Sequence, residues 1–332
     1  MSTWNPQDYR TRPVTILGGG VLGRRVGKPI LSTYTVTNKY TNETACVWSS
    51  AGYATRIFDP SPDQRQAAIT YITENAPSYA QRTAIQPNND IHAFDNLGDA
   101  VSTAWLVIEA VPEKLALKID TFAELATLAP ADCILASNSS SYKTSEMLDK
   151  IPAEAEARTR ILNTHYYMPP GNMIVELMTN GHTSADIFPF LVERSREAAL
   201  VPYVARKEST GFIFNRLWAA VKRESLMILA VGVSEPSEID DMWKRMFVEG
   251  GAMPCAMMDS KSFPLFLVPL VVFVANYTDV GLDTVAFIEE HYVKERGLSG
   301  EKTVDFLREK YLEKGRLGSK CEKGGLYPPA SK

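Results

Sequence analysis

The sequence predicts an α/β domain with a mostly parallel sheet, followed by an all-α C-terminal domain. Apolar runs of strand length alternate with helical patterns up to about residue 207, which is typical of a parallel α/β sheet. The first apolar run ends in a glycine-rich loop, and from about residue 209 the pattern is helical. We therefore expect a sheet-containing domain over residues 1–207 and a helical domain over residues 208–332.

Six apolar runs in the first domain have the length of buried strands. They cover residues 14–18, 54–59, 103–110, 132–138, 160–167 and 173–179. One helix is expected from the turn at residues 59–63 through Ala80, and another over residues 113–129, where apolar side chains recur at helical spacing. In the second domain, residues 211–233 form one long helical pattern, and residues 234–247 begin with a cap-like cluster and are helical again.

A glycine motif follows the first predicted strand directly. Residues 18–23 read G-x-G-x-x-G. In such a motif Gly18 would allow the tight turn, Gly20 the approach of a pyrophosphate to the backbone, and Gly23 close helix–strand packing. Val21 and Leu22 complete the loop, and the positive end of the next helix would attract phosphate. The motif predicts a Rossmann-type dinucleotide site; the alternative is a glycine turn that binds nothing.

Asp59 closes the second predicted strand, where an acidic residue would bind the ribose hydroxyls. Its charge would repel a 2′-phosphate, so NAD is favoured over NADP. The spacing is unusual, because Asp59 lies 36 residues beyond Gly23 where about 20 are expected. Residues 27–29, Gly-Lys-Pro, would also break the helix after the glycine loop.

Two segments, residues 28–44 and 260–279, are therefore predicted to be insertions. Both start where Gly-Lys or Ser-Lys can be encoded through a splice-donor sequence, and both end in Asn-x-Thr, which can be encoded as a branch point and acceptor. We infer two short in-frame introns that have been translated. Excision would place Asp59 about 18 residues beyond Gly23, near the usual spacing. The alternative is a pair of genuine surface insertions, which loops tolerate.

Composition and charge exclude several classes of protein. The net charge of −4 and the pI of about 5.7 provide no basic excess for nucleic acid. The four cysteines include no C-x-x-C pair and the four histidines no H-x3-H pair, which disfavours disulfide scaffolds and metal sites. The apolar run at residues 263–275 has 13 residues and two prolines, too short for a membrane span. Without an apparent secretory signal, we expect a cytoplasmic protein, with mitochondria as the alternative.

Several motifs together resemble the L-3-hydroxyacyl-CoA dehydrogenase family, over nearly all of residues 14–327. Besides the glycine loop, the motifs are VIEAVPEKLALK (107–118), ASNSSS (136–141), THYYMPPGNMIVE (164–176), STGFIFNRL (209–217), VGLDT (280–284) and KGGLY (323–327). The resemblance implies an NAD-dependent enzyme that transfers hydride between the 3-hydroxyl of an acyl-CoA and NAD. It also implies a role in fatty acid metabolism and a homodimer formed through the helical domain.

The resemblance implies an acid/base pair of His165 and Glu176. His165 would move the proton of the 3-hydroxyl, a task that suits imidazole because its ordinary pKa is near neutrality. Glu176 would fix the tautomer of His165 and stabilise the imidazolium. A lone histidine beside two tyrosines could instead be a packed residue. A carboxylate inside an apolar strand, however, needs a partner, and His165 lies on the neighbouring predicted strand.

Four further residues receive roles from the resemblance. Ser140 would hydrogen-bond the substrate oxygen, and Asn215 would orient the substrate and its developing charge. Glu113 and Lys118 match family positions near the cofactor and substrate, and Lys118 could meet a CoA phosphate. The alternatives are caps for Ser140 and Asn215 and a solvated helix face for Glu113 and Lys118.

Two alternatives to an acyl-CoA enzyme remain open. The family usually has Asn three residues after the catalytic His, and this chain has Met168. The substrate could therefore be a free hydroxy acid or sugar acid, as in the gulonate dehydrogenase and lambda-crystallin relatives. The interrupted helix after the glycine loop raises a further alternative, a non-catalytic product whose cofactor site is disrupted.

Overall fold

The structure of the chain, a computed structural model, describes residues 6–18, 42–83, 85–249, 282–317 and 321–326. The chain forms two compact units, Met1–Phe214 and Asn215–Lys332. The division falls seven residues after the expected boundary at 207. The backbone amides of Ile213 and Phe214 hydrogen-bond to a carboxylate of the first unit, which attaches these residues to it.

One eight-stranded sheet forms the centre of the first unit, in the order β3-β2-β1-β4-β5-β6-β7-β8. The strands are β1 (Val14–Gly18), β2 (Thr55–Phe58), β3 (Ile91–Phe94), β4 (Leu106–Ala110), β5 (Ile134–Ser137), β6 (Ile161–Tyr166), β7 (Ile174–Thr179) and β8 (Val201–Ala205). All neighbours pair in parallel except β6 and β7, which are antiparallel. The predicted Rossmann-type α/β class with a mostly parallel sheet is confirmed.

The two edge strands, β3 and β8, were not predicted from the sequence. Most of their residues are partly or fully exposed, so they lack the continuous apolar run that marks a buried strand. β8 also contains Pro202, which is tolerated mainly at a sheet edge.

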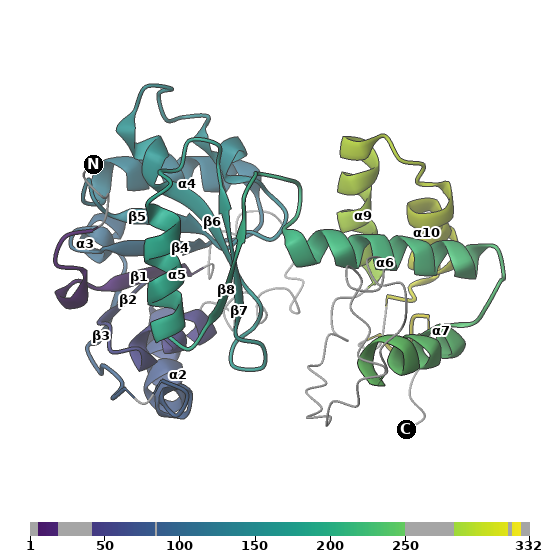
Figure 1. Cartoon of the computed structure of the whole chain (residues 1–332), viewed down its shortest axis with the longest axis horizontal. Coiled ribbons are helices and arrows are strands. Elements are labelled where there is room, and N and C mark those ends of the chain that lie inside the picture. Colours follow the sequence, from purple (N-terminus) through teal and green to yellow (C-terminus); the bar gives the residue numbers. More distant parts are fainter. Residues whose placement is uncertain (1–5, 19–41, 84, 250–281, 318–320, 327–332) are drawn as a thin grey trace, which may run out of the picture. The chain divides into compact units, whose positions relative to one another are not determined.

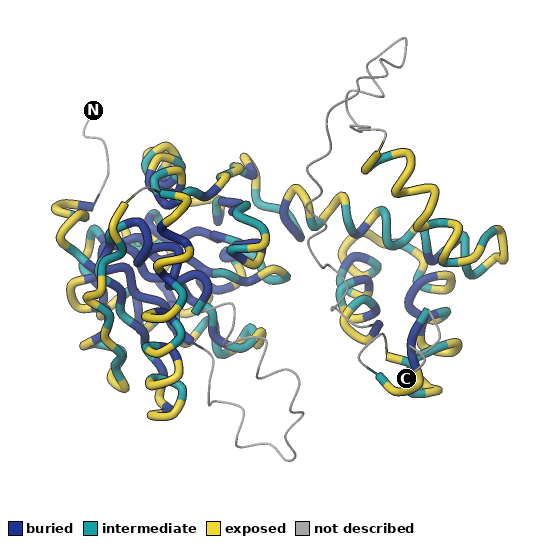
Figure 2. The backbone as a smooth tube through the Cα atoms, turned by 90° about the horizontal axis from the view of Figure 1, so that it is seen from below, coloured by how far each residue is buried: buried dark blue, intermediate teal, exposed yellow. Residues whose placement is uncertain are grey.

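Helices cover both faces of the sheet (Figure 1). They comprise residues 42–50, α2 (Pro62–Ala80), α3 (Leu97–Val101), α4 (Leu115–Leu128) and α5 (Ile187–Glu197), with short 3-10 turns at Tyr9–Thr11, Thr144–Leu148 and Glu156–Arg160. One apolar cluster joins the sheet to helix 42–50, α2 and α5, and a second joins the other face to α3 and α4. Figure 2 shows the buried strands at the centre and the exposed outer faces of the helices.

The C-terminal unit is helical in its described part, which contains no strand. Its elements are α6 (Ile213–Ala230, starting at the end of the first unit), α7 (Pro236–Trp243), α9 (Leu282–Arg296) and α10 (Phe306–Lys310), with π-helical turns at Lys244–Glu249 and Glu301–Asp305 and a 3-10 turn at Leu312–Lys314. Leu226, Ala286 and Leu307 form a small core. A partly buried ion pair between Arg223 and Glu289 (2.7 Å) connects α6 to α9.

Of the two predicted insertions, residues 260–279 lie outside the described residues, and so do residues 28–41. Residues 42–44 start the described helix 42–50, where Glu43 and Thr44 are buried. None of the described helices is long and apolar enough to cross a membrane.

Candidate functional site

The carboxyl ends of β1 and β2 form the expected dinucleotide edge. β1 lies between β2 and β4, the point where the strand order reverses and where open α/β sheets bind ligands. The parallel register pairs Leu17 with Phe58, so Gly18 and Asp59, the next residue of each strand, come side by side. Asp59 is buried, and its Oδ1 accepts a hydrogen bond from the Ser61 amide (2.8 Å). Gly20, Val21, Leu22 and Gly23 lie outside the described residues.

A buried carboxylate, Glu109, lies on the next strand at the same edge. It is fully buried in β4 and is paired in the sheet with Leu17 on one side and Ser137 on the other. Its Oε1 accepts hydrogen bonds from the Val111 amide (2.7 Å) and from Nζ of Lys118 (2.8 Å), and its Oε2 accepts one from Ser137 Oγ (2.7 Å). Glu109 is thus fully hydrogen-bonded.

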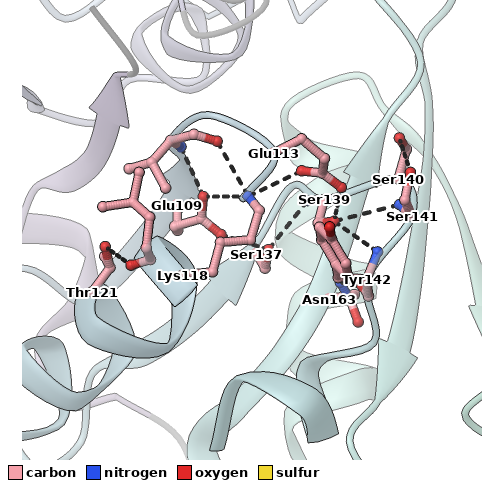
Figure 3. A network of polar contacts seen from close by, with 12 residues as sticks. Glu109, Glu113, Lys118, Thr121, Ser137, Ser139, Ser140, Ser141, Tyr142 and Asn163 are labelled. Atoms are coloured by element: carbon pink, nitrogen blue, oxygen red, sulfur yellow. Dashed lines mark hydrogen bonds and ion pairs between the residues drawn. The ribbon is translucent and has the colours of Figure 1, made fainter. Parts of the chain in front are cut away.

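These contacts close into a ring (Figure 3). Nζ of Lys118 also lies 3.2 Å from Oε2 of Glu113, and the Ser139 hydroxyl donates to the other oxygen of Glu113. The Ser139 amide then donates to Ser137 Oγ (3.2 Å). The ring joins the start of α4 to the serine-rich turn after β5, so that the two loops hold each other in place.

Lys118 is buried in this ring, with 1% of its side chain exposed. Burial alone would lower the pKa of Lys118, but its ion pairs with Glu109 and Glu113 outweigh burial and raise it. A buried ammonium that already has two carboxylate partners is not available to a CoA phosphate. The expectation that Lys118 meets a CoA phosphate does not agree with these contacts, because its ammonium is already paired inside the ring.

The sequence analysis does not predict the roles of Glu109 and Ser139 in this ring. The signal for Glu109 was present, since a carboxylate inside the apolar run 106–110 needs a partner in the same way as Glu176. Ser139 could not be told from its neighbours, because all three residues of the run 139–141 are serine.

His165 and Glu176 are directly opposite each other on β6 and β7. Residues at opposite positions of an antiparallel pair point to the same face of the sheet. Side chains alternate along each strand, and alternate apolar residues of β4, β5 and β6 belong to the two clusters on opposite faces of the sheet. By this alternation Glu109 and Ser137 lie on the same face as His165.

The carboxylate of Glu176 is held by neutral donors. The Tyr167 hydroxyl donates to its Oε1, as does the Phe214 amide (3.2 Å), and the Ile213 amide donates to its Oε2 (2.7 Å). Glu176 is 2% exposed. The expected hydrogen bond from His165 does not occur between these two described residues, because the carboxylate caps the first turn of α6 instead.

The His165 ring packs against two aromatic rings. It stacks on Phe212 (centroids 5.0 Å apart, 16° between planes) and makes a T-shaped contact with Tyr167 (centroids 4.5 Å apart). Its Nδ1 is buried and has no hydrogen-bond partner within the part of the chain that the structure describes. Burial lowers the pKa of His165 from 6.5 to about 4, so the ring is neutral at pH 7 and can accept a proton.

The two remaining predicted residues, Ser140 and Asn215, are less buried than Glu109 and Glu176. Ser140 is exposed, with its Oγ 3.5 Å from Ser141 Oγ. Asn215 is half-buried in the first turn of α6 and belongs to the helical unit. Met168, in the place of the family's usual Asn, is exposed with a left-handed backbone (φ 57°). Among the described residues, no group of acidic, histidine and cysteine side chains could hold a metal ion.

The fold and the switch-point residues define a Rossmann-type dinucleotide-binding protein. Residues 40–208 match the family described as the NAD-binding domain of 3-hydroxyacyl-CoA dehydrogenase. The chain belongs to this family and binds NAD as its cofactor. The match begins beyond the glycine loop and within the first predicted insertion.

Relatives that are described by different activities resemble this chain. The 3-hydroxyacyl-CoA dehydrogenase-like protein LAM1 of Cochliobolus heterostrophus is 43% identical over 175 residues, which cover 53% of this chain and 33% of LAM1. A probable 3-hydroxybutyryl-CoA dehydrogenase of Bacillus subtilis is 26% identical over 286 residues, covering 83% of this chain and 89% of that protein. A solved structure described as a diketoreductase acting on dicarbonyl compounds covers 96% of this chain and 99% of its own, with 26% identity and a TM-score of 0.66. The chain thus spans about a third of the length of LAM1.

Proposed function

We propose that this chain oxidises the 3-hydroxyl of an acyl-CoA to the ketone with NAD, or catalyses the reverse reduction. The observation that carries the proposal is the pairing of His165 on β6 with Glu176 on β7, which we call the His165–Glu176 rung. In it a neutral imidazole faces a buried carboxylate. The cofactor fits the edge described above, because β1 ends in Gly18 at the switch point and the neighbouring Asp59 is an acceptor for ribose hydroxyls. Bound NAD would supply the hydride acceptor.

His165 is the acid/base in this proposal. The neutral imidazole takes the proton of the 3-hydroxyl as hydride leaves the carbon that bears this hydroxyl, and it returns the proton in the reverse reaction. Glu176 has only neutral hydrogen-bond donors among the described residues, so its charge is available to stabilise the imidazolium across the rung. Ser140 and Asn215 are proposed to bind the substrate oxygen and to orient the substrate.

A free hydroxy acid or sugar acid is the second candidate substrate. Two observations favour it: Lys118 is buried between two carboxylates, and Met168 stands where the family usually has Asn. The likeness to a diketoreductase that acts on dicarbonyl compounds also supports a substrate other than a CoA ester.

The test is consumption of NADH with acetoacetyl-CoA, compared with NAD reduction with gulonate. The CoA ester should turn over faster, and His165→Ala should abolish the rate. A preference for gulonate would move the assignment to the second candidate. An unchanged rate in His165→Ala would overturn both.

A second experiment addresses the two predicted insertions. The full chain and a chain lacking residues 28–44 and 260–279 should be titrated with NADH. The full chain should bind more weakly, because the sequence has a proline at residue 29, where it would break a phosphate-binding helix after the glycine loop. Equal affinities would contradict the insertion hypothesis, and loss of binding only in the shortened chain would reverse it.

The proposed setting is fatty acid metabolism in the cytoplasm or mitochondria, with a homodimer formed through the helical unit. Sedimentation of the purified chain would test the dimer.

A further inference from the structure

We propose that Tyr167 is a positioning residue of the reaction, which keeps Glu176 facing His165. This inference rests on the proposed function, because it assigns Tyr167 to the same acid/base pair. Neither the glycine motif nor the family roles inferred above involve this tyrosine.

The ring of Tyr167 is buried and packs against two other rings. It makes T-shaped contacts with His165 (centroids 4.5 Å apart) and with Phe214 (centroids 5.7 Å apart). Its backbone amide donates to the Ile174 carbonyl (3.1 Å), which continues the pairing of β6 with β7 by one residue. Because Tyr167 is two residues after His165, both side chains point to the same face.

The hydroxyl of Tyr167 is the only side-chain donor to Glu176 among the described contacts. The other two donors are the backbone amides of Ile213 and Phe214 at the start of α6, one to each oxygen of the carboxylate. Without the phenol, Oε1 would keep only the longer hydrogen bond from the Phe214 amide (3.2 Å) in this set. A hydrogen bond to a charged acceptor is among the stronger ones, so the phenol restrains the carboxylate at the rung.

The second feature of the pair is the unpaired Nδ1 of His165. With the phenol bound to Glu176, the neutral ring has no partner for Nδ1 within the described residues, while the negative charge is held across the rung. The charge then stabilises the ring most strongly after it takes up a proton. That is the moment when a fixed carboxylate contributes to catalysis rather than to substrate binding.

The adjacent tyrosine offers a matched control. Tyr166 is also buried, but its hydroxyl accepts a hydrogen bond from Trp48 Nε1 (3.1 Å) on the other face of β6. Tyr167→Phe and Tyr166→Phe each delete one buried hydroxyl from consecutive residues. Only the first deletion touches the acid/base pair.

The experiment measures kcat, KM, the NADH dissociation constant and the melting temperature of both variants in the full chain. Tyr167→Phe should lower kcat about tenfold, the contribution of one hydrogen bond to a charged group, with KM and NADH affinity within about twofold of the parent. Tyr166→Phe should leave kcat unchanged. A parental kcat in Tyr167→Phe, or equal losses of kcat in both variants, would overturn the proposal. An active His165→Ala variant would instead remove the proposed function itself.

Discussion

Two buried carboxylates on one face of the sheet, Glu109 and Glu176, differ in the groups that surround them. Glu109 has a buried ammonium, Lys118, at 2.8 Å. Glu176 has a phenol and two backbone amides, and faces an imidazole that is neutral at pH 7. Burying a charge is costly unless it is paired and hydrogen-bonded.

The comparison teaches how similar residues come to different tasks. The charge of Glu109 is compensated by Lys118 within the ring that connects two loops, so its effect is on structure. The Glu176 charge is hydrogen-bonded but not neutralised among the described residues, so it remains available to a cation that forms next to it. A site residue is distinguished here by the balance of charge around it and not by its burial.

The largest expected effect comes from removing the ammonium of Lys118, the partner of Glu109. Lys118→Met should lower the free energy of unfolding by about 3–5 kcal/mol, because it leaves Glu109 buried without a cationic partner. Urea denaturation would measure this change. Adding Glu109→Gln should recover part of the loss, and a double variant no more stable than Lys118→Met would argue against a charge effect.

The second prediction concerns pH and the imidazole beside the other carboxylate. His165 stays neutral in the folded chain down to about pH 4, whereas a histidine in the unfolded chain takes up a proton near its ordinary pKa of 6.5. The unfolded state then binds more protons, so stability falls as the pH drops from 6.5 to about 4, by up to about 3 kcal/mol. The difference between the parent and His165→Asn over this range isolates the effect. A constant difference would contradict the lowered pKa of His165 in the folded chain.

The third prediction exchanges the two carboxylates for amides. Glu176→Gln should lower kcat about a hundredfold, because the imidazolium loses its counter-charge, with a small change in melting temperature. Glu109→Gln should show the opposite balance, with a larger loss of stability than of kcat. The same balance in both variants would break the comparison.

The smallest effect is expected from one neutral donor of the ring. Ser137→Ala removes the hydroxyl that donates to Glu109 (2.7 Å) and should cost about 1–2 kcal/mol of stability. NADH affinity should stay near the parental value, as measured by fluorescence titration. A stability loss as large as that of Lys118→Met would indicate that Ser137, rather than the ammonium, holds the ring.

Six of the eight strands could be predicted because each is a buried run of apolar residues with strand length. β3 and β8 escaped because edge strands are partly exposed and carry polar residues or proline. At the site, the positions of His165 and Glu176 were predicted from a family motif and from a carboxylate in an apolar strand. Their hydrogen bonds were not, because Glu176 binds amides of residues 213 and 214, which follow it by 37 and 38 positions.

The sequence by itself determined the Rossmann-type class, the preference for NAD and the family, because hydrophobic periodicity, glycine spacing and short motifs are local properties of the chain. Only the tertiary structure decided which charges meet. Lys118 was expected to face a ligand and instead lies between Glu109 and Glu113, and Tyr167 contacts Glu176 although the sequence marks it only as a neighbour of His165. The physical reason is that charge compensation depends on register and on side-chain direction across several strands, which no single segment encodes.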